Sequence, residues 1–552
     1  MNTSSREVLL FKEFAQAEEL HISDVAQELS VSSATIRNWI KTGILDSQTH
    51  GCVSRKSLEE FKERLLNSAK LTSRANKSKK RLHNHDKLSQ AILATLEDET
   101  FDETIINRYE ASLSESYRNK EGIYYTSPEI VTDMLKQVTV DDKTTFLDPC
   151  CGCGNFLVAA LDRGVCVDNL YGFDTDATAV EIAKRRVFER CGREATHIVC
   201  ADFLAVAQEL SISYDLIYTN PPWGKKIAKK QKDAYGEIYE SGKSNDSCSL
   251  FVFASMKLLA PGGSLGFLLP ESVLNIASFE SLRELFLSFT IEEIKDYGKP
   301  FKSIQTKVYS IILNNSTPPE GHQVNCFSKG YQLRSQASFL SNPKKIVNVW
   351  TSQREQEVIR LLLDTPHFTL TGNATWGMGV VTGDNKSKCS EAPADGLVPI
   401  FKGKDISPEG LGTPSYFIRA DLEGCQQVAP LSMYYAKEKI IYRFISKRLV
   451  FFLDTEQRLI LNSANMLLLS EDAPVSRRQL TSLLNSDLMN WFFNKLFNTH
   501  KVLRSDLELL PLYTKWFVGD EFDEKAFLDY NSILYIDGTY RVRSTDPQDV
   551  QG

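Results

Sequence analysis

The feature that most constrains this chain is a region between Thr144 and Leu269 where short apolar runs alternate with helical stretches. The apolar runs predict strands at 145–147, 170–173, 197–200, 216–218 and 264–269, and helices are predicted between them, at 177–190 and 247–259 among others. This alternation predicts an α/β fold with a doubly wound, mostly parallel, Rossmann-like sheet. Such sheets bind their ligands at the carboxyl ends of the strands.

Three acidic positions follow the first three of these strands. Asp148 begins the segment DPCCGCGNF, in which Gly152 and Gly154 permit a tight turn and a close approach of the backbone to a ligand. Asp174 ends the next strand, where a carboxylate is placed to bind two ribose hydroxyls. Asp202 follows the third strand and could accept a hydrogen bond from an adenine amino group, with Phe203 covering the ring.

The glycine loop holds no phosphate-binding pattern. Its spacing is not GxGxxG, and no Walker lysine follows Gly154, which disfavours NAD and ATP. The pattern favours S-adenosyl-L-methionine, whose sulfonium stands where those ligands carry phosphates. The crowded cysteines of the loop lack a second ligand pair nearby, so we interpret them as small loop residues and expect no metal.

The segment Asn220-Pro221-Pro222-Trp223 comes directly after the fourth strand. The Asn220 side-chain oxygen and the Pro221 carbonyl could each accept one N–H of an exocyclic amino group, which frees its lone pair for attack on a methyl group. Trp223 offers a stacking face for the base. An amino group inside a duplex cannot reach such a pocket, so the base must be flipped out.

Together, Glu121 to Leu313 resembles the gamma-class, TaqI-like N6-adenine DNA methyltransferases of restriction-modification systems, and is close to the modification subunits of type I systems. The resemblance implies a second stacking aromatic at Phe301, and methionine contacts at Tyr125, Thr126 and Pro128. The complete cofactor site that we expect comprises Tyr125, Thr126, Pro128, Asp148, Cys151, Gly152, Gly154, Asn155, Asp174, Thr175, Asp202, Phe203 and Asn220.

The amino-terminal segment Ile22 to Leu45 predicts two short helices joined by a tight turn, and resembles the winged helix-turn-helix of the MerR family. Its second helix carries Thr35, Arg37 and Asn38, which are suited to a DNA groove. The alternative is a helical hairpin that binds protein or only packs. We expect domains at 1–68 (helix-turn-helix), 69–115 (basic linker and helical segment), 116–345 (methyltransferase) and 346–552 (target recognition).

The carboxyl-terminal region interleaves short β-like runs with aromatic and basic residues, and looks like a TaqI-type target-recognition domain of mixed α+β structure. For each basic residue taken alone, a surface salt bridge is the better explanation. The candidate DNA contacts, which include two lysines after the Asn-Pro-Pro-Trp segment, are Lys225, Lys226, Lys402, Lys404, Arg443, Lys447 and Arg504.

Composition limits the partners and the compartment. The net charge of −7 gives no global sign of nucleic-acid binding, so a double-stranded DNA partner requires local basic surface. The 11 scattered cysteines, and the lack of an apolar run of the roughly 20 residues that a membrane helix needs, favour a cytoplasmic, nucleoid-associated protein. We expect a monomer on DNA, with any cognate restriction endonuclease on a separate chain.

Two further interpretations of the function stay open. One is methylation of another amino group, on cytosine N4, on RNA or on a protein glutamine. The other is a DNA-binding regulator with an inactive methylase core, against which the intact Asn220 and Asp174 argue.

Overall fold

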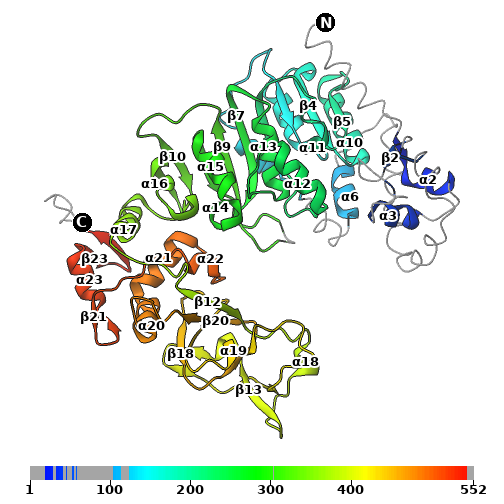
Figure 1. Cartoon of the computed structure of the whole chain (residues 1–552). Helices are drawn as coiled ribbons and strands as arrows, with labels where there is room; N and C mark the ends of the chain where they lie inside the picture. Colours follow the sequence, from blue (N-terminus) through cyan, green and yellow to red (C-terminus); the bar gives the residue numbers. More distant parts are fainter. Residues whose placement is uncertain are drawn as a thin grey trace. The chain divides into compact units, whose positions relative to one another are not determined.

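The computed structural model describes residues 19–28, 33–41, 45, 52–54, 57–58, 104–113, 124–301 and 304–543. The chain divides into two compact units, one formed by residues 1–273 and 278–331, and the other by residues 274–277 and 332–552 (Figure 1). The predicted linker from residue 69 lies outside the described part as far as Thr104. None of the helices in the described ranges is long and apolar enough to cross a membrane.

A nine-stranded sheet, in the order β11-β10-β8-β9-β7-β6-β3-β4-β5, forms the centre of the first unit. The five strands predicted from the sequence pair with one another in parallel and confirm the α/β fold: β3 (Phe146–Asp148), β4 (Leu170–Asp174), β5 (Ile198–Cys200), β6 (Tyr214–Thr219) and β7 (Leu259–Pro270). Strands β3 and β4 are apolar along almost their whole length because both faces of a parallel sheet are covered.

The sheet becomes mixed beyond β7. Strand β9 (Val308–Asn314) is antiparallel to both β7 and β8 (Thr290–Asp296), and β10 (Gln323–Phe327) is parallel to β8. The outermost strand is β11 (Tyr331–Ser335), at whose first residue the division between the two units falls.

Helices follow the strands, and local sequence explains where two of them begin. Helix α9 (Asn155–Asp162) starts after Gly154, and α10 (Ala177–Cys191) starts at Asp176, whose carboxylate accepts hydrogen bonds from the backbone of Thr178 and Ala179. Further helices in the described part of this unit include α6 (Thr104–Ser112), α8 (Pro128–Met134), α11 (Phe203–Val206), α12 (Lys229–Ile238), α13 (Ser247–Met256) and α15 (Glu280–Ser288).

The amino-terminal region contains two short helices, α2 (Ile22–Glu28) and α3 (Ser33–Lys41), and an antiparallel pair of strands, β1 (Glu19–His21) and β2 (Cys52–Ser54). Val25 and Ile36, from the two helices, are buried in one apolar cluster. The side chains of Thr35 and Asn38 lie outside the described part. The MerR-like character of this region stays a prediction.

The second unit is mixed α+β, as predicted. A four-stranded antiparallel sheet has the order β12-β20-β17-β18, and a three-stranded sheet has the order β16-β13-β19. These strands are β12 (Ala374–Met378), β13 (Leu397–Phe401), β16 (Tyr416–Arg419), β17 (Lys439–Arg443), β18 (Phe451–Asp454), β19 (Leu459–Ile460) and β20 (Ala464–Leu469).

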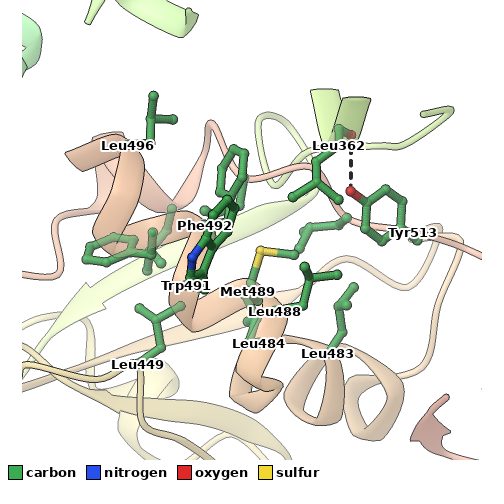
Figure 2. Packing of buried hydrophobic residues seen from close by; sticks show 14 of the residues in the cluster. Leu362, Leu449, Leu483, Leu484, Leu488, Met489, Trp491, Phe492, Leu496 and Tyr513 are labelled. Carbon is green, nitrogen blue, oxygen red and sulfur yellow. Dashed lines mark hydrogen bonds between the residues drawn. The ribbon is translucent and has the colours of Figure 1, made fainter. Parts of the chain in front are cut away.

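Helix α21 (Asp487–Phe497) fills the larger core of this second unit. Figure 2 shows Trp491 and Phe492 of α21 among leucines from several elements, and the Tyr513 hydroxyl donates to the carbonyl of Leu362 at 3.0 Å. Leu362 belongs to α17 (Gln353–Asp364), and α20 (Arg477–Asn485) precedes α21. The last elements are two hairpins, β21 (Phe517–Val518) with β22 (Glu521–Phe522) and β23 (Ile533–Ile536) with β24 (Thr539–Val542), and the helix between them, α23 (Glu524–Tyr530).

Candidate active site

A cavity of about 380 Å³ lies at the carboxyl ends of β3, β4 and β6. It brings together most of the residues that the sequence predicts for the cofactor: Tyr125, Thr126, Asp148, Cys151, Gly152, Asn155, Asp174, Thr175, Asp202, Phe203 and Asn220. Two predicted residues do not line it: Pro128 is the first residue of α8, and Gly154 precedes α9.

The glycine loop adopts the conformation that its sequence predicts. Gly152 and Gly154 have φ angles of +48° and +84°, in the left-handed region that favours glycine. A Cβ atom on Gly154 would lie 3.0 Å from the Cβ of Ala183 in α10, so close packing also excludes a side chain there. The loop is tied to the second strand because Asp174 accepts hydrogen bonds from the backbone N–H groups of Gly152 and Asp176, both at 2.9 Å.

Burial raises the pKa of three acidic side chains in the cavity. It raises the pKa of Asp148 to about 7, although this carboxylate accepts from the Thr219 hydroxyl at 2.6 Å and the Cys150 N–H at 3.1 Å. Burial, and then the nearby Asp176, raise the pKa of Asp174 to about 6. Burial also raises the pKa of Asp202. A cavity with three such acids fits a ligand that carries positive charge.

Asn220 directly follows β6, and its side chain is held in one orientation. Its Nδ2 donates to the carbonyl of Tyr124 at 2.6 Å, while its Oδ1 is buried and has no hydrogen-bond partner within the described ranges. Because a buried polar atom without a partner is costly and Asn220 lines the cavity, this atom is available to accept a hydrogen bond from a ligand. The Tyr124 segment is itself fixed, because Asn155 donates to the Thr126 carbonyl at 2.8 Å and accepts from Arg186 at 2.7 Å.

Three aromatic rings from distant segments meet beside Asn220. Trp223 is 8% exposed, and its indole N–H donates to the carbonyl of Leu268 at 3.2 Å. The ring centroids of Tyr124 and Trp223 are 5.4 Å apart, those of Tyr124 and Phe301 5.6 Å, and those of Trp223 and Phe301 5.5 Å. The structure thus brings together Trp223 and Phe301, which are 78 positions apart in the sequence (301 minus 223).

Sequence analysis missed three residues of this site. Tyr124 adds the third ring, and Phe251 of α13 packs beside Phe203 with ring centroids 5.7 Å apart. Ser247 lines the cavity and donates to the carbonyl of Pro222 at 2.6 Å. The only signal for Tyr124 was its place beside Tyr125, and helix 247–259 carried no motif at all.

Two of the predicted DNA contacts, Lys225 and Lys226, line the cavity. Lys225 lies close enough to Asp174 and Asp202 to lower the pKa of both carboxyls, against the larger effect of burial. The charged end of Lys225 therefore favours the ionised forms of the acids assigned to the cofactor.

Arg37 of α3, which was also predicted to contact DNA, is half-buried.

The basic residues predicted for DNA in the second unit differ in how they are held. The Arg443 guanidinium donates to the carbonyl of Ile406 at 2.8 Å, and the Lys402 ammonium lies 3.9 Å from the centre of the Tyr416 ring. Arg504 forms an ion pair with Glu508 at 2.8 Å. Three of the predicted contacts are exposed: Lys404, Lys447 and Arg504.

The fold and the site together define a class of protein. A Rossmann-like sheet with a glycine loop after its first strand, acids after the second and third, and Asn-Pro-Pro-Trp after the fourth is the arrangement of an S-adenosyl-L-methionine-dependent methyltransferase. Residues 102–287 match the family model described as N-6 DNA Methylase, and residues 398–512 match the TaqI-like C-terminal specificity domain.

Similarity to known proteins is extensive. The chain is 44% identical over 396 residues to the Type II methyltransferase M.VspI of Vibrio sp. (strain 343). The aligned residues make up 71% of this chain and 97% of M.VspI. This chain therefore belongs to the TaqI-like family of restriction-modification DNA methyltransferases. A more distant relative is the modification methylase CviBIII of Paramecium bursaria Chlorella virus NC1A, 24% identical over 38% of this chain and 53% of its own length.

Two solved structures share the fold at low sequence identity. The DrdV–DNA complex has a TM-score of 0.50 and 13% identity, and covers 92% of this chain and 67% of its own. A nuclease-deletion mutant of the Type ISP enzyme LlaGI also has a TM-score of 0.50 and 13% identity, and covers 96% of this chain and 68% of its own.

Proposed function

We propose that this DNA methyltransferase acts at a specific site in double-stranded DNA and methylates the N6 amino group of an adenine flipped out of the helix. The observation that carries the proposal is the buried Asn220 Oδ1, an acceptor without a partner in the described chain, held at the cofactor cavity by the bond from Nδ2 to Tyr124. An exocyclic amino group supplies the donor that this atom lacks.

The chemistry follows from these acceptors. The lone pair of an aromatic amino group is delocalised into the ring, so the nitrogen is a poor nucleophile. Asn220 Oδ1 and the Pro221 carbonyl each accept one N–H, which favours tetrahedral geometry at nitrogen, while Pro221 and Pro222 keep the backbone rigid. The cofactor supplies a methyl group on a sulfonium. The methylated amine is strongly acidic until it loses a proton, so no strong general base is needed.

The aromatic cluster of Tyr124, Trp223 and Phe301 supplies stacking surface for the flipped base. Because the three centroids are within 5.6 Å of one another, a base can enter between two rings only after one of them moves. Stacking on Trp223 and Phe301 holds the amino group in line with the methyl group, and this orientation contributes much of the rate.

The cofactor roles fit the cavity. We assign Asp174 to the ribose hydroxyls, Asp202 to the adenine amino group, and Phe203 with Phe251 to the adenine ring. We assign the methionine end to the segment of Tyr125, Thr126 and Pro128, of which Tyr125 and Thr126 line the cavity. The positive charges of the cofactor would balance the buried Asp148 and its neighbours, whose ionised forms burial otherwise disfavours.

Recognition of the DNA sequence is proposed for the second unit, which contains the match to the specificity domain. Lys404 and Lys447, both exposed, are the better candidates for DNA contact there. The Arg443 side chain donates to the carbonyl of Ile406, so we expect it to stabilise the conformation of that loop and to contact DNA only indirectly. We further propose that Arg37 and its helix contact DNA, that the enzyme acts as a monomer, and that a cognate endonuclease is a separate chain.

The test is the identity of the methylated nucleoside. Purified protein, plasmid DNA and labelled S-adenosyl-L-methionine should yield N6-methyladenine on digestion to nucleosides. Asn220→Ala should abolish transfer, because the amino-group acceptor is lost, and leave cofactor affinity, measured by calorimetry, nearly unchanged, because Asp174, Asp202 and the rings assigned to the cofactor remain. The matched control is Asn169→Ala, which removes a surface amide that donates to the carbonyl of Asp142.

The alternatives give different products. N4-methylcytosine would assign the enzyme to the other DNA base, and labelled RNA with unlabelled DNA would move the substrate to RNA. Cofactor binding without transfer to DNA, RNA or protein would favour a regulator with an inactive core. Equal loss of transfer and cofactor affinity in Asn220→Ala would remove the case for Asn220 as the amino-group acceptor.

A further inference from the structure

We propose that Ser247 is a positioning residue for methyl transfer, because its hydroxyl joins the two ends of the turn that presents Trp223. This inference rests on the proposed function, since Trp223 matters only if a base stacks there. Ser247 is the first residue of α13, lines the cofactor cavity and is 1% exposed. None of the motifs in the sequence includes it.

The hydroxyl of Ser247 is engaged on both sides. It donates to the carbonyl of Pro222 at 2.6 Å and accepts from the backbone N–H of Lys225 at 3.1 Å. The carboxylate of Asp246 lies 3.4 Å away and accepts from the Cys248 N–H at 3.2 Å. The much shorter distance to Pro222 therefore assigns the single hydroxyl proton to that carbonyl.

The chain changes direction between Pro222 and Lys225, with bends at Trp223 and Gly224. Gly224 has a φ of +63°, the left-handed conformation that the third residue of a type II turn requires. Such a turn is commonly closed by a direct bond from the N–H of the fourth residue to the carbonyl of the first. Here the Ser247 oxygen takes the N–H of Lys225 and its proton goes to the carbonyl of Pro222, so α13 holds both ends.

This turn links three functional groups. It begins two residues after Asn220, places Trp223 where its indole N–H reaches the Leu268 carbonyl, and ends at Lys225, which lines the cavity. Loss of the Ser247 hydroxyl removes one hydrogen bond from each end of the turn. We expect the turn to relax, so that the base and its amino group are held less well for attack while the cofactor still binds.

The test compares Ser247→Thr with Ser247→Val, nearly isosteric side chains that differ in the hydroxyl, and adds Ser247→Ala. Ser255→Ala is the matched control, because Ser255 is buried in the same helix and its Oγ has no hydrogen-bond partner among the described residues. Single-turnover transfer of labelled methyl groups to DNA is measured, with cofactor affinity by calorimetry and folding by thermal denaturation.

Ser247→Val and Ser247→Ala should slow single-turnover transfer by about tenfold or more, the effect typical of a lost buried hydrogen bond, whereas Ser247→Thr should recover most of the rate. Cofactor affinity should change by less than about twofold in all of them, since none of the residues assigned to the cofactor is replaced. If Ser247→Val fails to fold, the comparison of Ser247→Ala with Ser247→Thr carries the same information.

Equal rates for the Thr and Val variants, or an equal loss in Ser255→Ala, would overturn the proposal. A loss of cofactor affinity as large as the loss of rate would also overturn it. The readout counts methyl groups on any base, so an unexpected product would contradict the proposed adenine specificity and still leave the comparison at Ser247 decisive.

Discussion

Asp148 and Asp174 are buried in the cofactor cavity with pKa values raised to about 7 and about 6. Without a ligand, the folded protein binds more protons at these groups than the unfolded chain does between their ordinary pKa of 3.8 and these raised values. Their contribution to stability is therefore largest at low pH and is lost as pH rises through about 6 to 7. A bound ligand with positive charge lowers the pKa of both carboxyls, because it stabilises their ionised forms.

We predict that affinity for S-adenosyl-L-methionine increases as pH is raised through about 6 to 7, because ionised Asp174 can accept from both ribose hydroxyls and ionised Asp148 balances the positive charge. Calorimetric titration across this range measures the effect. Asp174→Asn should bind more weakly and show a flatter pH profile, since one of the two titrating groups is gone.

Asp421→Asn is the control for this profile. Asp421 is an exposed carboxyl whose pKa its hydrogen bond with Arg419 lowers to about 2, outside the window, so the profile should not change. An affinity that stays constant or falls between pH 6 and 7 would contradict the role of the buried acids.

Among the helices and strands, α6 packs against the glycine loop of the cofactor cavity. Its buried Tyr109 donates a hydrogen bond to Asp176, the residue that caps α10, and its apolar side chains pack with Cys153 of the glycine loop and Ala179 of α10. One short helix ahead of the sheet thus holds the start of a helix that borders the cofactor site. The family match to N-6 DNA Methylase also begins before it, at residue 102.

Two truncations test this arrangement. Removal of residues 1–84 should weaken DNA binding but leave methyl transfer and cofactor affinity nearly intact, because α6 remains. Removal of residues 1–113 also removes Tyr109 and its apolar neighbours, and should abolish cofactor binding. Gel shift and calorimetry measure the two effects. Loss of all transfer in the shorter truncation would refute the modular organisation of the amino-terminal region.

At the scale of the whole molecule, chemistry and the specificity match fall in different units. The described residues that we assign to cofactor and amino group belong to the first unit, while residues 398–512, which match the specificity domain, belong to the second. The second unit has its own apolar core around α21, which includes Phe492 and Leu496. Its stability can therefore be changed without touching the cofactor cavity.

Phe492→Ala should destabilise the second unit by about 3–5 kcal/mol, the usual cost of removing a buried aromatic ring. DNA binding should fall while cofactor affinity stays unchanged, as measured by scanning calorimetry, gel shift and cofactor titration. Val518→Ala, at a position in the same unit that is 72% exposed, is the control. An equal loss of cofactor affinity in Phe492→Ala would show that the two units are not separable in this way.

The parallel part of the sheet, and the meeting of most of the predicted cofactor residues at its edge, could be inferred from the residues alone. Motifs that each follow a strand, such as those at Asp148, Asp174 and Asn220, must come together, because parallel strands place all their carboxyl ends at one edge. The positive φ angles of Gly152 and Gly154 were also predictable, since they depend on local backbone sterics.

Which side chains from distant segments meet depends on the folding of the whole chain. Tyr124 in the aromatic cluster, Ser247 at the Pro222 carbonyl and Lys225 beside the cofactor acids follow from how a loop or helix docks on the sheet. No local pattern encodes such contacts, because a buried serine or a lysine in a loop has the same sequence signature whichever group it finally touches.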